Sequence, residues 1–161
     1  LDSLGIADLP VPVEEVARAC GAAVTRERFR RDLSGMVVRD DDGDGAVIGV
    51  NSTHHPRRQR FTVAHEIGHL RLHKGRKLTV DSGLRVDYRD DAGNPTIAEE
   101  RDANAFAAAL LMPAPAVQAQ AEPLVRAGAT RSALVSSLAR TFEVSEEAMG
   151  YRLLNLGFLS Y

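Results

Sequence analysis

The sequence predicts an α+β fold in which a small sheet packs against a long buried helix, with further helices at the C-terminal end. The chain has 161 residues, 44% of them hydrophobic, which is enough apolar mass for one core. Short β-branched stretches separated by polar turns come before residue 51, and apolar residues at helical spacing dominate after residue 56. No long linker divides the chain, so we expect residues 1–161 to form a single compact domain. Because the chain starts at Leu1 and not at Met, we also expect residues to be missing upstream.

The first third of the chain predicts one helix and a small sheet. Pro12 precedes apolar residues at helical spacing, and Gly21 is a suitable C-terminal cap for that helix. Three short β-branched or apolar stretches then follow, at residues 22–28, 35–39 and 45–50. Because polar turns connect these stretches, we expect a sheet of about three strands, paired in an antiparallel manner.

A long helix and a long loop are predicted next. Pro56 is favoured in a first helical turn, and helical spacing continues from it to about His73, with Gly75 as the stop. Residues 75–95 are polar and show no clear period, which predicts a loop or short irregular elements. Loops of this length in compact domains are usually functional.

The C-terminal part of the chain predicts three further helices. Thr96 and Glu99 form a capping box at the start of the first, which runs to the break at Pro113. Two more helices are expected at about residues 131–142 and 145–156. The last two resemble a helix-turn-helix, in which the two helices are joined by a short turn.

Composition and charge exclude several classes of function. The chain has 20 Lys and Arg residues against 22 Asp and Glu residues and a formal net charge of −2, so no global positive field attracts nucleic acid. The last expected helix begins with Ser145, Glu146 and Glu147, and these carboxylates would repel phosphate. No apolar run approaches the roughly 20 residues of a bilayer-spanning helix. A single cysteine fits the reducing cytoplasm. We therefore expect the two C-terminal helices to pack in the core and not to bind DNA. We also expect a cytoplasmic protein that does not bind membranes and does not bind nucleic acid directly.

The main chemical motif is the HExxH string from His65 to His69 on the long helix. The two imidazoles lie one helical turn apart on one face, so both can reach a single Zn²⁺ at about 2 Å. Glu66 lies on the adjoining flank, where it could take a proton from a water molecule activated by the metal. The alternative interpretation is that both histidines are ordinary core residues with backbone partners. The apolar circumference of this helix indicates burial, and buried imidazoles are costly unless paired or bound to metal.

The helix that begins near Thr96 offers a third zinc ligand, Glu100, with Asn104 one turn further on. Glu99 is already used in the capping box, which leaves Glu100 free for a metal, and Asn104 could accept a hydrogen bond from the outer ring nitrogen of a zinc-bound histidine. The alternative for Glu100 is a surface acid favoured by the helix dipole. His73 stands roughly 12 Å along the axis from His65, too far to share its metal, and we expect it to meet free carbonyls at the helix end.

The chain resembles the ImmA/IrrE family of zinc metallopeptidase-like proteins. Residues 60–69 with Leu72 and His73 resemble the central motif of that family, residues 100–113 resemble its second signature, and residues 144–153 resemble its C-terminal part. The resemblance implies a zincin-like fold, His65, His69 and Glu100 as zinc ligands of the gluzincin type, Glu66 as general base, and Asn104 as the partner of a ligand histidine. It also implies a role in mobile-element, phage or stress regulation, where family members act on helix-turn-helix repressors or sit beside toxin–antitoxin pairs.

The expected function is therefore hydrolysis of a specific protein partner, such as a helix-turn-helix repressor or an antitoxin. An extended substrate could pair with a sheet edge near the active helix, for which we expect residues 46–50. Tyr88 or Arg89 in the long loop could assist the oxyanion as donors, although such loop side chains are usually solvated. The alternative function is a regulatory binding protein that keeps the zincin fold and sequesters a partner or, less favoured, binds DNA.

Overall fold

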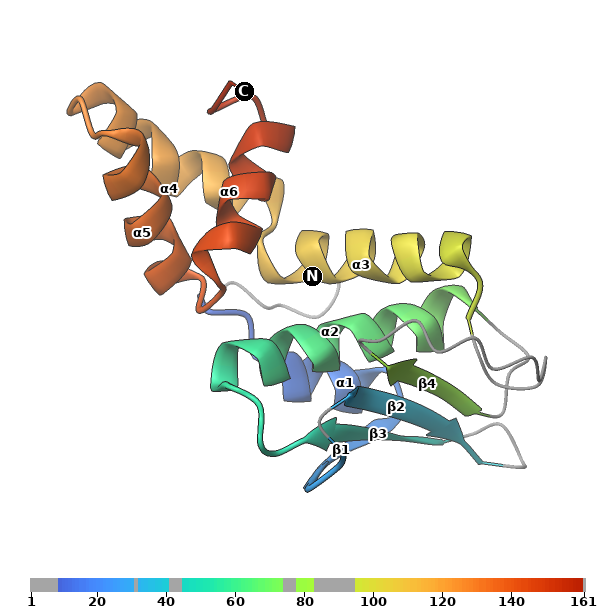
Figure 1. The fold of residues 1–161 in the computed structure, drawn as a ribbon. Helices are drawn as coiled ribbons and strands as arrows, with labels where there is room; N and C mark the ends of the chain where they lie inside the picture. The colour runs from blue at the N-terminus through green and yellow to red at the C-terminus, as the bar shows by residue number, and fades with distance from the viewer. Residues whose placement is uncertain (1–8, 31, 41–44, 74–77, 83–94, 161) are drawn as a thin grey trace. The chain divides into compact units, whose positions relative to one another are not determined.

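The fold, in a computed structural model, consists of six helices and four strands within the residues described, which are 9–30, 32–40, 45–73, 78–82 and 95–160 (Figure 1). No helix in these ranges has the length and apolar character needed to cross a membrane. The elements are α1 (Val13–Ala19), β1 (Ala22–Glu27), β2 (Leu33–Arg39), β3 (Ala46–Asn51), α2 (Pro56–Leu72), β4 (Leu78–Ser82), α3 (Ile97–Leu111), α4 (Ala114–Arg126), α5 (Arg131–Thr141) and α6 (Glu146–Asn155).

The α+β class is confirmed, but the sheet is mixed and has four strands, in the order β1-β3-β2-β4. β2 pairs antiparallel with both β3 and β4, whereas β1 pairs parallel with β3. The expectation of a purely antiparallel sheet is therefore wrong for one pair. β3 lies between β2 and β1 in the sheet. It runs antiparallel to β2 and in the same direction as β1.

The strand order also corrects the expected substrate edge. Residues 46–50 lie in β3, which has a neighbouring strand on both sides, so its backbone groups are already paired. The outer strand on the β2 side is β4, in a region predicted to be a loop. Its five residues are bounded by polar sequence and too short to show a strand period. Among the described strands, none pairs with the outer edge of β4.

The core of the sheet unit lies between α2 and the strands. Val37 and Ile48 of the sheet and Val63 and Ile67 of α2 are each 0% exposed. Gly35 of β2 allows a close approach, because a Cβ atom there would collide with the methyl group of Thr62 on α2. Burial of these branched side chains is the main stabilisation of α2 against the sheet.

Arg39 at the end of β2 caps the C-terminal end of α2. Its guanidinium donates to the backbone carbonyls of His69, Leu70 and His73, at 2.9, 3.2 and 3.0 Å. Burial lowers the pKa of Arg39 from its ordinary value, but a guanidinium still stays charged at neutral pH. A cation at the negative end of a helix dipole, bonded to its free carbonyls, stabilises the last turn of the helix.

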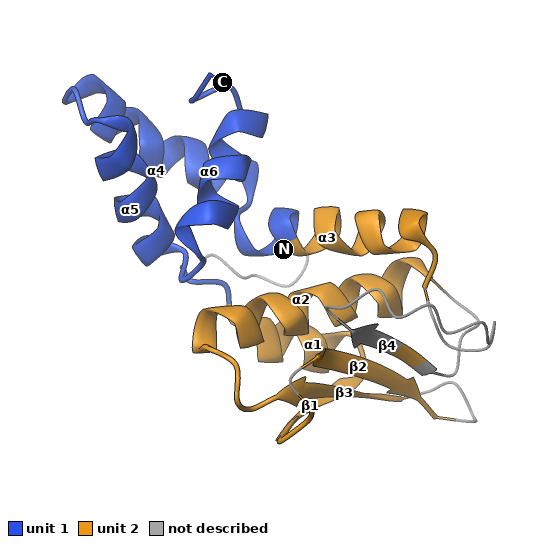
Figure 2. Cartoon of the chain, in the orientation of Figure 1, with its two compact units in different colours: residues 1–11, 108–161 blue, residues 12–107 orange. Residues whose placement is uncertain are grey.

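The described chain divides into two compact units, residues 12–107 and residues 1–11 with 108–161 (Figure 2). α3 contributes to both. The second unit contains α4, α5 and α6, and its buried core includes Leu138, Phe142, Met149 and Leu153. The expected helices near residues 131–142 and 145–156 are confirmed, with Ser145 as the N-cap of α6.

The helix α4 was missed in the sequence because prolines border and interrupt it. Pro115 lies in the first turn, where backbone N–H groups make no hydrogen bond within the helix, so the lack of an N–H group in proline costs nothing there. Pro123 lies inside the helix and removes one hydrogen bond. Buried Val117 and Ala121 anchor α4, so packing outweighs the local penalty.

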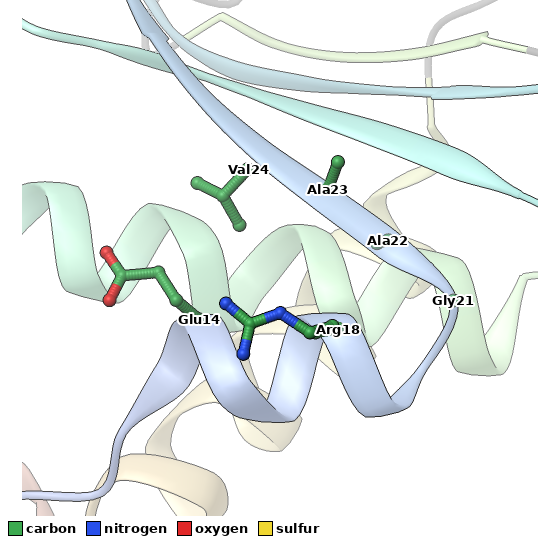
Figure 3. A pocket seen from close by; sticks show the side chains of 6 residues that line it. All are labelled: Glu14, Arg18, Gly21, Ala22, Ala23 and Val24. Carbon is green, nitrogen blue, oxygen red and sulfur yellow. The ribbon is translucent and has the colours of Figure 1, made fainter.

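A pocket of about 460 Å³ lies where α1 leads into β1 (Figure 3). Figure 3 shows Glu14 and Arg18 on α1 beside the first residues of β1. Its lining residues are Glu14, Arg18, Gly21, Ala22, Ala23 and Val24. None of the predicted site residues lines it.

Candidate metal centre

α2 carries both histidines of the HExxH motif into the interior. The helix starts as predicted, with Pro56 in the first turn and the His55 ring accepting a hydrogen bond from the Arg57 backbone N–H at 3.2 Å. His65 and His69 follow about two and a half and three and a half turns later, and their exposed fractions are 3% and 1%. Apolar neighbours on several sides of α2 cause this burial, as the sequence predicted.

α3 brings Glu100 to the two histidines. The expected capping box at its start is present, since Thr96 N–H donates to the Glu99 carboxylate at 2.6 Å and Glu99 N–H donates to the Thr96 hydroxyl at 3.2 Å. Glu99 is thus occupied at the helix start, and Glu100 lies one residue further on, facing α2. Of these two adjacent glutamates, Glu100 is the one whose carboxylate lies beside the rings of His65 and His69.

The three side chains form one compact cluster of donor atoms. The Nε2 atoms of His65 and His69 lie 3.0 Å apart, and the Glu100 carboxylate oxygens lie 3.4 Å from the first and 3.2 Å from the second. Tetrahedral zinc with ligand bonds of about 2.0–2.1 Å holds neighbouring donor atoms about 3.3 Å apart. The observed separations are close to that value, so this donor set fits a zinc ion.

The electrostatics of the cluster also suit a cation. Two imidazole lone pairs at 3.0 Å repel each other unless a proton or a metal ion lies between them. Burial raises the pKa of Glu100, but hydrogen bonds to His65 and His69 and the charges of these rings more than offset this effect and lower the pKa to about 2. The carboxylate is therefore ionised at neutral pH, as metal binding requires.

The outer ring nitrogens of both histidines have partners. His65 Nδ1 lies 3.1 Å from Asn104 Oδ1, the contact expected from the sequence. His69 Nδ1 lies 3.0 Å from His73 Nδ1. The expectation that His73 meets the free carbonyls at the end of α2 is wrong: Arg39 binds those carbonyls, and the His73 ring contacts the ring of His69. The repeated four-residue spacing of 65, 69 and 73 was the signal for this contact.

Glu66 lies outside the donor cluster, on the flank of α2 that faces the sheet. It is 0% exposed, and a Cβ atom at Gly35 of β2 would come within 3.1 Å of its Oε1. The donor cluster of His65, His69 and Glu100 does not include this carboxylate. Tyr88 and Arg89, the candidate oxyanion donors, lie outside the described residues.

The close approach of α2 and α3 depends on Gly68. A Cβ atom at this position would lie 3.0 Å from the Cα atom and 3.2 Å from the carbonyl oxygen of Ala103 on α3. Both are backbone atoms, so relief requires movement of the helix itself. Glu100 is on the turn of α3 just before Ala103, and the glycine therefore controls its distance from the histidines.

We expect Gly68→Ala to lower the free energy of unfolding by about 1–3 kcal/mol through overpacking and to weaken zinc binding. The matched control is Gly150→Ala in α6, where an added Cβ meets nothing within 4 Å. The control should raise the unfolding free energy by about 0.5–1 kcal/mol, because alanine is the better helix former. Urea unfolding and zinc titration of both variants test this. Equal zinc affinities in Gly68→Ala and in the unchanged protein would contradict it.

A mixed sheet covered by a helix with HExxH, with a glutamate supplied by the next helix, is the arrangement expected from the resemblance to zincin-like metallopeptidases. The chain belongs to the Peptidase_M78 family, whose model, described as the IrrE N-terminal-like domain, matches residues 19–154. The match runs through both compact units.

Two curated relatives agree with this family. The chain is 40% identical over 114 residues to the radiation response metalloprotease IrrE of Deinococcus radiodurans. The aligned segment covers 70% of this chain and 32% of that relative. It is 41% identical over 112 residues to the protein of the same name from Deinococcus deserti, covering 70% of this chain and 37% of the relative. The aligned part thus spans about a third of the length of these relatives.

Proposed function

We propose that the chain is a zinc-dependent regulatory peptidase in which His65, His69 and Glu100 bind the metal and Glu66 is the general base. The observation that carries this proposal is the cluster of three donor atoms at separations of 3.0–3.4 Å, drawn from two helices, with both histidines buried and Glu100 partly exposed. Membership of a metallopeptidase family supports the same chemistry. We further propose that residues 1–161 act as a single domain, since the family match spans both units.

Each residue has a distinct task in peptide hydrolysis. Zinc, when bound, supplies Lewis acidity that makes water more acidic and polarises the scissile carbonyl. Glu66 accepts the proton from the attacking water and delivers it to the leaving amine. Asn104 accepts a hydrogen bond from His65 Nδ1–H, which leaves the Nε2 lone pair of His65 available to the metal.

The substrate that we propose is a specific protein, such as a helix-turn-helix repressor or an antitoxin-like protein. The resemblance to the ImmA/IrrE family and the radiation response named for the Deinococcus relatives support a regulatory substrate. An extended segment of it can pair with the outer edge of β4, since backbone pairing there needs no particular side chains. The single cysteine fits action in the cytoplasm.

Removal of the metal tests the proposal as a whole. The purified chain should contain close to one zinc per molecule, and dialysis against a chelator should abolish cleavage of a repressor or antitoxin substrate. Adding back zinc should restore cleavage. Metal analysis by mass spectrometry and gel electrophoresis of the substrate provide the two readouts. Cleavage that persists in metal-free protein would overturn the proposed chemistry.

A further inference from the structure

His69 is held at both of its ring nitrogens. Its Nε2 atom faces His65 Nε2 and the Glu100 carboxylate, and its Nδ1 atom lies 3.0 Å from the Nδ1 atom of His73. The two rings are tilted by 52° with centroids 5.1 Å apart, so they meet through nitrogen atoms and are not stacked. His73 thus occupies, beside His69, the position that Asn104 occupies beside His65.

Proton placement follows from the chemistry of imidazole. A histidine that offers its Nε2 lone pair to a metal carries its proton on Nδ1, and that N–H is a donor. His69 Nδ1–H must then donate to His73 Nδ1, which must be unprotonated. With Nδ1 acting as the acceptor, the ring N–H of His73 is on its own Nε2, which faces the Asp102 carboxylate at 4.0 Å.

The backbone holds His73 in this place. Its N–H donates to the His69 carbonyl at 3.1 Å, and its own carbonyl accepts from Arg39 at 3.0 Å. Arg39 also donates to the carbonyl of His69, so the same guanidinium on β2 holds the backbone of both His69 and His73. The His73 side chain is only 10% exposed, so water does not compete freely for its Nδ1 atom.

We propose that His73 is a positioning residue that fixes the Nδ1–H tautomer and the ring orientation of His69 for metal binding. The inference rests on the proposed function, because it needs His69 to be a ligand. It goes further by assigning a role to a residue that the donor cluster does not include. Partners of this kind typically contribute about 10–100-fold to metal affinity.

Two substitutions of His73 separate its hydrogen bond from its bulk. In His73→Asn, the Oδ1 atom occupies the place of Nδ1 and can still accept from His69. In His73→Leu, a side chain of similar volume accepts nothing. We expect zinc affinity, measured by competition with a chromogenic chelator, to fall about 10–100-fold in His73→Leu and to recover to within a few-fold in His73→Asn. The visible absorption of the Co²⁺-substituted protein should change in the leucine variant alone.

A measurement on the unchanged protein covers the case in which a variant fails to fold. Long-range ¹H–¹⁵N spectra of the zinc-loaded chain should show His69 protonated at Nδ1 and His73 protonated at Nε2. A proton on His73 Nδ1, or equal zinc affinity in the unchanged protein and His73→Leu, would overturn the positioning role while leaving the zinc site intact. If the unchanged protein binds no zinc, the proposed function itself fails, so the two failures are distinguishable.

Discussion

Replacing Glu66 by glutamine should reduce peptide hydrolysis by about 10²–10⁴-fold while zinc stays bound. Glutamine has the same shape as glutamate but cannot accept the proton of the attacking water. Glu66 is 0% exposed and is not part of the donor cluster, so the substitution changes proton transfer and leaves the metal ligands in place. Cleavage rate of the protein substrate and zinc content of the same preparation are the measurements.

The matched control is Glu66→Asp, which keeps the carboxylate but withdraws it by one methylene group. Activity between that of the unchanged protein and Glu66→Gln is expected, because a displaced base still accepts a proton, less efficiently. If Glu66→Gln retains full biological activity in cells, turnover is not the function. The protein then acts by sequestering its partner, and a mobility shift at low salt would test the remaining possibility of DNA binding.

Replacing Glu100 by alanine should remove most of the bound zinc. The variant leaves two imidazoles where three donors converge, and the ionised carboxylate that balances the charge of the cation is lost. The loss of affinity should exceed the roughly 10–100-fold effect of removing a hydrogen-bond partner of a ligand. Metal analysis after gel filtration and competition titration with a chelator are the measurements.

The neighbouring residue provides the control for this experiment. Glu99→Ala removes the carboxylate of the capping box and should lower the unfolding free energy by up to about 1 kcal/mol without changing zinc content. Near-stoichiometric zinc in Glu100→Ala would exclude Glu100 as a ligand. Equal zinc loss in both variants would assign the effect to the stability of α3 and not to coordination.

Much of the local structure could be predicted because it depends on residues within one helical turn. The start of α2 at Pro56, the capping box of Thr96 and Glu99, and the end of α1 before Gly21, which has a φ of 80°, are properties of short segments. The facing pair of His65 and His69 follows in the same way from four-residue spacing.

Other features depend on residues distant in the sequence, and spacing could not decide them. β3 lies between β1 and β2. The β-propensities of the three segments do not distinguish this strand order from the others that they could form. β4 has too few residues to show a period, and α4 forms despite Pro123 because Val117 and Ala121 are buried. Local preferences are weak, and burial against a distant partner outweighs them.

The sequence by itself determined which residues could bind a metal: two histidines on one helical face, and Glu100, since the neighbouring Glu99 is used in the capping box. Only the tertiary structure decided that these groups meet. The meeting requires α2 and α3 to approach at Gly68, where a single methyl group would collide with the Ala103 backbone. Arg39 of β2 also holds the last turn of α2, where His73 meets the outer nitrogen of His69. The approach of Gly68 to Ala103 and the hydrogen bonds of Arg39 join elements far apart along the chain, and their energies arise from packing and hydrogen bonding that exist only after folding.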